Sequence, residues 1–500
     1  MTHEIELDVL IVGSGAGGGT VAARLASLCA SGARIAVAEA GPWYGREHFN
    51  MRERDMIGLF VDRGAVPAAN FEIAVSAGRC VGGSTSVYTG VTFRTPGEVL
   101  QDWGAGAGDP GLEDDVLARF ERLEQEIDAH FPDPASYENE NNRVFRAGCE
   151  RLGWPVGRFR VNIRDCRRCG FCNLGCPYGS KRGTLEVQLP AALAQGVELI
   201  ANCAIERVWD GGASGVIAPA PSGTRAGTRT DAHPAGAVRF KAKHVVLAGG
   251  TLGTPALLLR SRLPQLSPAC GRYVTLHPAL TSFGQMRDEV RGFDGFPKLY
   301  YTDQWSAEHH YYLESAFYFP FVTARSLPGF GAELKQAMRG YGRLACALTL
   351  VHDAAERENR IALRGDRALL EYRLSQQTRR ALVHAQQRAG ELFFAAGAER
   401  YFTPVSERFA IERADQLARA IDERALQSGR VVVSSAHPMG GCAMSSDFEL
   451  GVTDSYGVVH GHPGLVVADG SLFPSSSKVN PYLTIMALAE RCAEQLRARL

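Results

Sequence analysis

A glycine-rich turn close to the amino end constrains the fold of this chain more than any other feature. Residues 8–12 (DVLIV) form a short apolar run, and the glycines Gly13, Gly15 and Gly18 follow it in the pattern G-x-G-x-x-G. The apolar run predicts a buried parallel strand, and residues 19–26 continue with helical spacing. Glycines at these places let the backbone turn tightly, and a helix that starts there presents free N–H groups to an anion.

A second strand and an acidic residue complete this pattern. Residues 35–38 (IAVA) predict another buried strand, and Glu39 follows it directly. In dinucleotide-binding units an acid about 20 residues after the glycine motif bonds a ribose hydroxyl. We therefore predict a dinucleotide site at Gly13, Gly15, Gly18 and Glu39, rather than a glycine-rich turn of another kind of α/β protein. These residues do not distinguish FAD from NAD.

Length and charge bound the classes of protein to which the chain can belong. Its 500 residues exceed what one hydrophobic core usually organises, so we expect two domains. Lys plus Arg and Asp plus Glu both number 54, which argues against nucleic acid as a partner. No apolar run has the length of a membrane span, and residues 1–6 lack the basic head of a signal peptide. We expect a cytoplasmic protein whose 12 cysteines are thiols or metal ligands.

Four cysteines form a compact run in the middle of the chain. Cys166, Cys169, Cys172 and Cys176 have the spacing C-x2-C-x2-C-x3-C-P, which bacterial ferredoxins use to hold iron–sulfur clusters. No second run is present to share a fourth ligand as in two-cluster ferredoxins. Two interpretations therefore stand: an iron–sulfur cluster, or a structural loop in which Gly175, Gly179 and Lys181 matter more than the sulfurs.

Two further segments predict backbone close to a cofactor. Residues 78–86 (GRCVGGSTS) include Gly82, Gly83 and Ser84, where backbone amides can approach a flat ring or a diphosphate unless the segment is an ordinary turn. Residues 245–259 predict a buried strand, a glycine turn and a helix.

The region 271–430 differs in character. Aromatic residues alternate around 299–301 and 309–319, which predicts an antiparallel sheet, and helices are expected near 376–395 and 413–423. We interpret 1–270 as a nucleotide-binding domain with a peripheral segment at about 95–160 and the cysteine loop at 166–181. Residues 271–430 then form a discontinuous substrate domain, and 431–500 return to the first domain.

The carboxyl-terminal segments resemble a known family. His437 begins the sequence HPMGGC, residues 463–471 read PGLVVADGS, and Asn480 begins NPYLTIMALAER. This region is similar to the closing part of the glucose–methanol–choline (GMC) flavoprotein oxidoreductases, and most similar to their cholesterol-oxidase and long-chain-alcohol-dehydrogenase branch. The segments at 13–39, 82–84 and 247–259 are similar to that family too. The resemblance implies a Rossmann-like FAD-binding domain joined to a substrate domain.

The resemblance also assigns roles to residues. Gly13, Gly15, Gly18 and Glu39 would bind the ADP half of FAD, and Gly82, Gly83 and Ser84 would lie along the flavin ring. Asp469, Gly470 and Pro481 would complete the cofactor site, and His437 and Asn480 would face flavin N5. Tyr88 departs from the family, whose members often carry Asn there.

These residue types suit the oxidation of a CH–OH group to an aldehyde or ketone. Histidine titrates near neutrality, so His437 is the expected acceptor of the hydroxyl proton, and Asn480 can hold the substrate oxygen without adding charge. Oxygen or an electron carrier would accept the electrons. Tyr300, Tyr301, Tyr311, Tyr312 and Glu314 favour an aminosugar hydroxymethyl group from antibiotic synthesis as substrate. The alternatives are a sterol or fatty alcohol oxidase or dehydrogenase, and an electron-transferring dehydrogenase with an iron–sulfur cluster.

Overall fold

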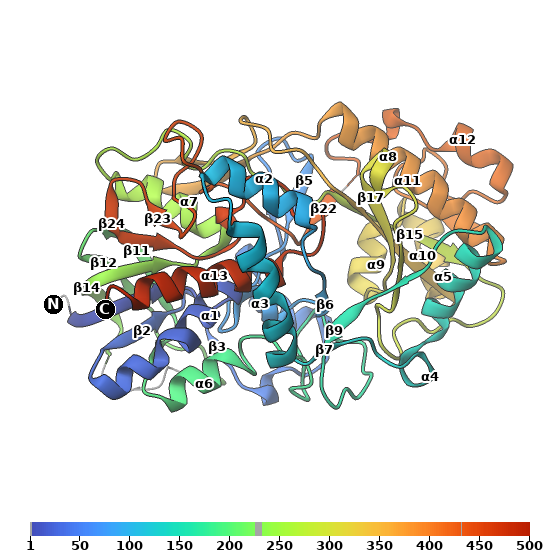
Figure 1. The fold of residues 1–500 in the computed structure, drawn as a ribbon. Helices are drawn as coiled ribbons and strands as arrows, with labels where there is room; N and C mark the ends of the chain where they lie inside the picture. Colours follow the sequence, from blue (N-terminus) through green and yellow to red (C-terminus); the bar gives the residue numbers. More distant parts are fainter. Residues whose placement is uncertain (1–2, 226–232, 432) are drawn as a thin grey trace.

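Two large sheets organise the molecule. The computed structural model describes residues 3–225, 233–431 and 433–500. Figure 1 shows one sheet on the left, between α1 and α13 in front and α7 above, and the second on the right with α5 and α11. Each sheet has its own hydrophobic core, and smaller clusters lie beside them.

The first sheet has eight strands and contains the predicted nucleotide-binding unit. Its main order is β10-β2-β1-β14-β12-β11, with β24 paired to β14 and β23 paired to β24. The strands β10, β2, β1, β14 and β24 run parallel, whereas β11 and β12 are antiparallel to their neighbours. The bounds are β1 His3–Val12, β2 Ile35–Ala38, β10 Glu198–Ile200, β11 Cys203–Trp209, β12 Gly212–Ile217, β14 Gly236–Leu247, β23 Val458–Val459 and β24 His462–Val467.

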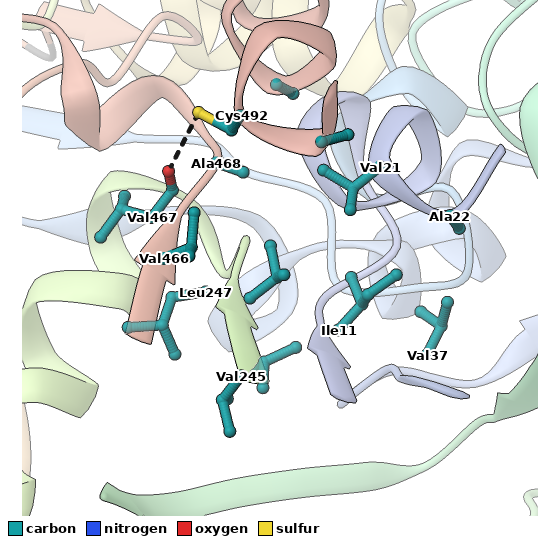
Figure 2. Close-up of a cluster of buried hydrophobic side chains, with 14 of the residues drawn as sticks. Ile11, Val21, Ala22, Val37, Val245, Leu247, Val466, Val467, Ala468 and Cys492 are labelled. Atoms are coloured by element: carbon teal, nitrogen blue, oxygen red, sulfur yellow. Dashed lines mark hydrogen bonds between the residues drawn. The ribbon is translucent and has the colours of Figure 1, made fainter. Parts of the chain in front are cut away.

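The carboxyl-terminal segment completes this first sheet. Its strand β24 pairs with β14, and helix α13 (Tyr482–Arg497) packs against α1 (Ala16–Leu25). Figure 2 shows Ile11, Val245 and Val466 from neighbouring strands in one buried cluster beneath α1 and α13. The thiol of Cys492 on α13 donates to the carbonyl of Val467 at 3.6 Å. The two ends of the chain therefore share one core.

Helix α1 lies unusually close to the strands because it starts with glycines. A Cβ added to Gly17 would lie 1.7 Å from the carbonyl oxygen of Ala468, and one on Gly18 would lie 1.9 Å from that of Gly13. Both distances are far below contact, so no larger side chain fits there. The glycines therefore fix the depth at which the helix amino end sits over the sheet.

The second sheet has nine strands and draws on several parts of the chain. All its pairs are antiparallel, as predicted, except β22 with β5. Four of its strands come from outside 271–430, namely β4, β5, β8 and β22. The bounds are β4 Val66–Pro67, β5 Ile73–Val75, β8 Gly157–Arg158, β15 Ala279–Gln285, β16 Tyr300–Thr302, β17 Tyr311–Ser315, β18 Leu344–Val351, β21 Arg400–Phe402 and β22 Val433–Ser435.

The remaining elements surround these two sheets. Helix α11 (Gln376–Ala395) has the predicted bounds, begins at a Ser375 cap and packs on β15 and β18. The shorter helix α12 (Leu417–Ala420) lies inside the predicted segment 413–423. The other helices are α2 Gly97–Ala107, α3 Leu112–Glu126, α4 Pro134–Tyr137, α5 Glu140–Arg151, α6 Gln188–Ala194, α7 Gly250–Ser261, α8 Ser306–His309, α9 Pro320–Ser326 and α10 Gly331–Arg339. Small sheets are formed by β3 Trp43–Tyr44 with β13 Thr224–Arg225, by β6 Val91–Thr92, β7 Ala129–His130 and β9 Arg160–Asn162, and by β19 Arg360–Arg364 with β20 Arg367–Glu371. Across the described ranges, no helix combines the length and the apolar character that crossing a membrane requires.

Candidate active site

One cavity of about 1250 Å³ joins the two sheets and the carboxyl-terminal segment. It exceeds the volume of about 300–1,000 Å³ that is usual for a small-molecule site, so it has room for an extended cofactor and a substrate. Of the residues predicted for the cofactor and the chemistry, the following line it: Gly13, Gly15, Glu39, Gly83, Ser84, His437, Asp469, Gly470, Asn480 and Pro481. The structure thus places ten predicted site residues around one space.

The first glycine turn forms one end of this cavity. Gly13 has a φ of +102°, and a Cβ there would lie 2.3 Å from the carbonyl oxygen of Ala248. Gly15 caps α1 without a side-chain hydrogen bond, so the helix amino end presents backbone N–H groups. Gly18 does not line the cavity; it packs α1 onto the turn from behind. Gly18 therefore packs α1 closely onto the turn, and its direct contact with the cofactor stays a prediction.

Glu39 directly follows β2, at the expected place for a ribose contact. Its carboxylate is 6% exposed and accepts hydrogen bonds from Ser14 N (3.0 Å), Ser14 Oγ (2.7 Å) and Gly41 N (2.8 Å). Two of these bonds reach Oε2 and one reaches Oε1. A carboxylate has about four acceptor positions, so Oε1 retains capacity for a hydroxyl group. Burial raises the pKa of Glu39 above its ordinary value.

The second glycine loop lies directly against the first. A Cβ on Gly83 (φ +52°) would lie 2.8 Å from Gly15 Cα, so glycine is required where the two loops meet. Ser84 accepts a bond from Gly78 N at 3.0 Å. Gly82 is also predicted to contact the cofactor, but it does not line the cavity, and its N–H donates to Ser14 Oγ at 3.0 Å. Gly82 therefore supports the first loop from behind.

Tyr88, which departs from the family pattern, closes this side of the cavity. Its hydroxyl accepts from Asn162 Nδ2, and its ring meets Tyr482 edge-on at a centroid distance of 5.0 Å. Burial raises the pKa of the Tyr88 hydroxyl above its ordinary range.

Asp469 joins the end of β24 to α7. Its carboxylate accepts from Gly250 N (2.7 Å), Thr254 Oγ1 (2.6 Å), and the N–H and hydroxyl of Ser471 (2.8 and 2.6 Å). These four bonds hold Gly470 at the cavity wall next to Ile485 of α13. Asp469 thereby anchors the wall, and Pro481 lines it at the start of α13.

His437 and Asn480 meet at the same wall although they come from separate segments. Asn480 Nδ2 lies 3.2 Å from His437 Nε2. Burial, with further contributions from the charge of Lys298 and from His352, lowers the pKa of His437 to about 3. The imidazole is therefore neutral over the physiological range.

A second histidine that the sequence did not indicate supports this one. His277 Nδ1 lies 3.3 Å from His437 Nδ1, and His277 Nε2 lies 2.7 Å from Ser476 Oγ. His277 is fully buried, and burial holds its pKa well below the ordinary value. Its only local signal is the following proline, which it shares with His233, His437 and His462, so the sequence could not single it out.

Lys298 is the second residue missed by sequence reasoning. It lines the cavity, is 7% exposed, and forms an ion pair with Glu314, which is 1% exposed. Glu314 itself does not line the cavity, and neither do Tyr300, Tyr301, Tyr311 and Tyr312. The residues that favoured an aminosugar therefore lie outside the cavity, because the strands β16 and β17 direct them into the core and toward neighbouring elements.

The outer part of the cavity carries apolar surface beside charged side chains such as Arg325, Glu333 and Glu407. Its wall includes Phe319, Val322, Leu327, Phe330 and Phe409 from α9, the loop before α10 and the loop after β21. Phe330 is 87% exposed and marks the opening toward solvent.

The cysteine run surrounds a small cavity of its own. All four cysteines line a space of about 20 Å³, which holds about one water molecule and is too small for an iron–sulfur cubane. Burial raises the pKa of the Cys172 thiol to about 12. Within the described part of the chain, no group of three or more His, Cys, Asp or Glu side chains is placed to hold a metal ion. The structure does not support the predicted cluster at Cys166, Cys169, Cys172 and Cys176.

The same loop shows contacts expected of a structural role, the second interpretation of the cysteine run. Lys181 Nζ donates to the carbonyls of Ser86 (2.8 Å), Tyr88 (2.9 Å) and Cys172 (2.7 Å), which ties the loop to the cavity wall. Gly175 has a φ of +100°, and a Cβ there would lie 2.2 Å from the Phe49 ring.

Comparison with known proteins agrees with this geometry. Family models described as GMC oxidoreductase match residues 56–279 and 355–489. The chain belongs to the GMC oxidoreductase family. An uncharacterized GMC-type oxidoreductase of Mycobacterium tuberculosis is 32% identical over 506 residues, which cover 99% of this chain and 76% of that protein. A long-chain-alcohol oxidase of Arabidopsis thaliana is 29% identical over 528 residues, covering 97% of this chain and 67% of that one.

Solved structures show the same fold. Formate oxidase of Aspergillus oryzae RIB40, whose structure concerns the modification of its FAD, superimposes with a TM-score of 0.72 at 15% identity, covering 100% of this chain and 99% of that one. The predicted α/β fold with a Rossmann-like FAD-binding domain is confirmed. As a GMC oxidoreductase, this chain is an FAD-dependent enzyme that acts on CH–OH donors.

Proposed function

We propose that this GMC oxidoreductase oxidises a predominantly apolar alcohol to an aldehyde or ketone, with His437 as acceptor of the hydroxyl proton. Oxygen is the terminal oxidant, so that R–CH₂OH and O₂ give R–CHO and H₂O₂. The observation that carries the proposal is the meeting of His437 Nε2 and Asn480 Nδ2 at 3.2 Å, on the wall of the cavity whose other end is the glycine turn.

The residues around the cavity fit FAD. Gly13, Gly15 and Glu39 would hold its ADP half: the close approach of the Ala248 backbone leaves no room for a side chain at Gly13, and Glu39 retains acceptor capacity. Gly83, Ser84, Gly470 and Pro481 would line its remainder. FAD, when bound, supplies the acceptor for the carbon-bound hydride.

The protein's own residues handle the hydroxyl group. A neutral His437 has one ring nitrogen free to take the proton, and its low pKa keeps it neutral at any physiological pH. Without substrate the Asn480 amide donates to His437 Nε2; with the alcohol bound, Asn480 donates to the substrate oxygen and His437 Nε2 accepts from the hydroxyl group instead. Lys298, at the same cavity wall, stabilises the negative charge that develops on that oxygen as the proton leaves.

The lining of the outer cavity supports a long-chain or aromatic alcohol as substrate. Phe319, Val322, Leu327 and Phe409 offer apolar surface, and the Arabidopsis relative is named a long-chain-alcohol oxidase. An amine-bearing sugar finds no carboxylate at Glu314, which is occupied by Lys298. A sterol is the alternative apolar alcohol.

Anaerobic reduction of the bound flavin tests this proposal. Decanol, benzyl alcohol, a sterol and an aminoglycoside are mixed in turn with the holoenzyme, and bleaching of the flavin band is followed. We expect decanol or benzyl alcohol to bleach the flavin and the aminoglycoside to leave it oxidised. His437→Ala should slow bleaching by a factor on the order of 100 to 10,000. His130→Ala, a change of an exposed histidine on β7, serves as the matched control.

The outcomes separate the alternatives. Bleaching by the sterol alone would assign the sterol class, and bleaching by the aminoglycoside alone would restore the aminosugar substrate. If no alcohol bleaches the flavin, or if His437→Ala bleaches as fast as the control, the proposal fails. Peroxide formed in a one-to-one ratio with aldehyde identifies oxygen as acceptor, whereas turnover only with an added dye identifies an electron carrier.

A further inference from the structure

We propose that His277 is a positioning residue for His437: by accepting a hydrogen bond from His437 Nδ1–H, it fixes the tautomer whose Nε2 is free to take the substrate proton. The inference rests on the proposed function of His437. It concerns a residue pair that the backbone of two distant segments brings together, with the two Nδ1 atoms 3.3 Å apart.

The hydrogen bonds of this group allow two proton arrangements. A neutral imidazole carries one N–H, and two facing Nδ1 atoms share a single proton. In one arrangement Asn480 donates to His437 Nε2, His437 Nδ1–H donates to His277, and His277 Nε2–H donates to Ser476 Oγ. In the other arrangement Ser476 Oγ donates to His277 Nε2, His277 Nδ1–H donates to His437 Nδ1, and His437 Nε2 carries a hydrogen, which requires the Asn480 amide to turn its Oδ1 toward it. Only the first leaves Nε2 as an acceptor, so a proton-accepting His437 requires His277 Nδ1 to be unprotonated.

The backbone of His277 is held in an unusual conformation. Its φ is +50°, in the left-handed region that residues other than glycine seldom adopt. The buried carboxylate of Asp353 accepts from Leu276 N (2.8 Å) and His277 N (2.9 Å), and Tyr372 donates its hydroxyl to the same carboxylate at 2.6 Å. Strained backbone that its surroundings hold in place is typical of functional sites.

The segments that carry the two histidines are also tied to each other. Thr275 and Met439 exchange a pair of backbone hydrogen bonds of 3.0 and 2.9 Å. Ser435 Oγ accepts from His437 N at 3.1 Å and donates to the carbonyl of Leu276. The relative position of the two rings is therefore fixed by backbone contacts on both sides, which is what a base and its orienting partner need.

Three variants test this role. His277→Leu removes the acceptor with little change of volume. His277→Asn keeps an acceptor at the place of Nδ1, and asparagine tolerates the left-handed region. Ser476→Ala removes the acceptor for His277 Nε2–H, together with the one that Ser476 Oγ offers to Lys478 N, and leaves both rings. Flavin content and thermal unfolding are recorded for each, so that a folding defect is separated from a catalytic one.

Three measurements report on the variants. Anaerobic flavin reduction should slow on the order of 100-fold in His277→Leu, with unchanged half-saturating alcohol concentration, and less than about tenfold in His277→Asn. Ser476→Ala should lose about fivefold, the equivalent of one neutral hydrogen bond. The solvent deuterium isotope effect on reduction should rise in His277→Leu, because transfer of the hydroxyl proton becomes slower. In ¹⁵N-histidine NMR of the holoenzyme, the His437 signal, assigned through His437→Asn, should show a protonated Nδ1 in the wild type and a protonated Nε2 in His277→Leu.

The result can overturn the inference without touching the proposed function. Suppose that alcohol reduces the flavin of the wild type, and that His277→Leu has a reduction rate within about threefold of it and an unchanged isotope effect. His277 then has no positioning role. Equal losses in folded His277→Asn and His277→Leu would assign a steric role instead. A wild-type NMR signal with His437 Nε2 protonated would indicate the reversed proton arrangement and would also contradict the inference about His277. Should wild type fail with every alcohol, the proposed function fails first.

Discussion

Lys298 and Glu314 form an ion pair almost closed to solvent, and only the lysine reaches the cavity wall. The acid lies on β17 and the lysine just before β16, so the second sheet holds a cation at the cavity wall and pairs it with a carboxylate behind that wall. This arrangement stabilises negative charge in the cavity without leaving a buried charge unpaired.

The first prediction concerns this pair. Glu314→Gln should destabilise the protein by about 3–5 kcal/mol, because it leaves the Lys298 ammonium buried without its partner. The double change Lys298→Met with Glu314→Gln should recover most of that loss, since both charges are removed. Urea unfolding, analysed with one common slope of free energy against urea concentration, measures the stability of both variants.

An exposed pair serves as control for the same lysine change. Lys241 bonds Glu4 at the surface, with a side-chain exposure of 56%, so Lys241→Met should leave the unfolding midpoint nearly unchanged. A double variant at 298 and 314 that is no more stable than Glu314→Gln would show that the ion pair is not the source of the loss.

The second prediction concerns acid. Burial lowers the pKa of His437 to about 3 and holds those of His277 and His352 well below the ordinary value of 6.5. The unfolded chain therefore takes up protons at these histidines below pH 6.5, while the folded protein does not. Stability should be complete above pH 6.5 and fall as pH decreases, by about 1.4 kcal/mol for each histidine at pH 5.5. Asp353, whose pKa is raised to about 6 by burial, acts in the opposite direction.

A variant isolates one of these histidines. His352→Phe keeps the aromatic ring that packs beside Tyr312, at a centroid distance of 4.7 Å, but cannot be protonated. Between pH 7.5 and 5.5 its free energy of unfolding should fall by about 1.4 kcal/mol less than that of wild type. Parallel pH curves for the two proteins would contradict a neutral His352 in the folded state.

Local sequence was sufficient for the nucleotide-binding unit and for the elements near it. Strand β2, helix α11 and the residues of the glycine turn were predicted at or near their bounds because their signals are local: apolar runs, helical spacing and obligatory glycines. His437 and Asn480 were predicted to act together because a family motif includes both, although 42 residues separate them in the sequence. In the structure their side chains do meet.

The rest of the site depends on contacts that no local pattern encodes. His277 is placed by pairing of Thr275 with Met439, and Lys298 by an ion pair with Glu314. The aminosugar prediction was weakened for the same reason: the tyrosines near 300 and 311 alternate as a strand, but the pattern cannot tell which face meets the cavity. The cysteine spacing matches that of a cluster-binding run, but spacing alone does not show what fills the loop. In the structure the loop bonds to Lys181 and encloses a space for about one water molecule.

The third prediction separates the two interpretations of the cysteine loop. Protein purified without air should show flavin absorption without an iron–sulfur shoulder, and should carry no stoichiometric iron or sulfide. Cys169→Ser and Cys176→Ser should retain wild-type flavin content. Lys181→Met should lose flavin on dilution, because three carbonyls, one of them that of the cavity-lining Tyr88, lose their donor, at a cost of about 1–3 kcal/mol each when they stay unpaired. Stoichiometric iron, together with loss of it in both cysteine variants, would restore the cluster.

The last prediction tests why the third position of the first glycine motif, Gly18, needs to be a glycine. A Cβ on Gly18 would lie 1.9 Å from the carbonyl oxygen of Gly13 and 3.1 Å from Ala248 Cβ, so Gly18→Ala must push α1 away from the turn. Because Gly18 packs behind the cavity, we expect loss of flavin through displacement of the helix, with a lowered thermal midpoint as well. Gly106→Ala on α2 is the matched control: nothing lies within 4 Å of the added Cβ, so it should stabilise by about 0.5–1 kcal/mol through the unfolded state. A Gly18→Ala protein with wild-type flavin content and melting temperature would mean that the turn does not need this close approach.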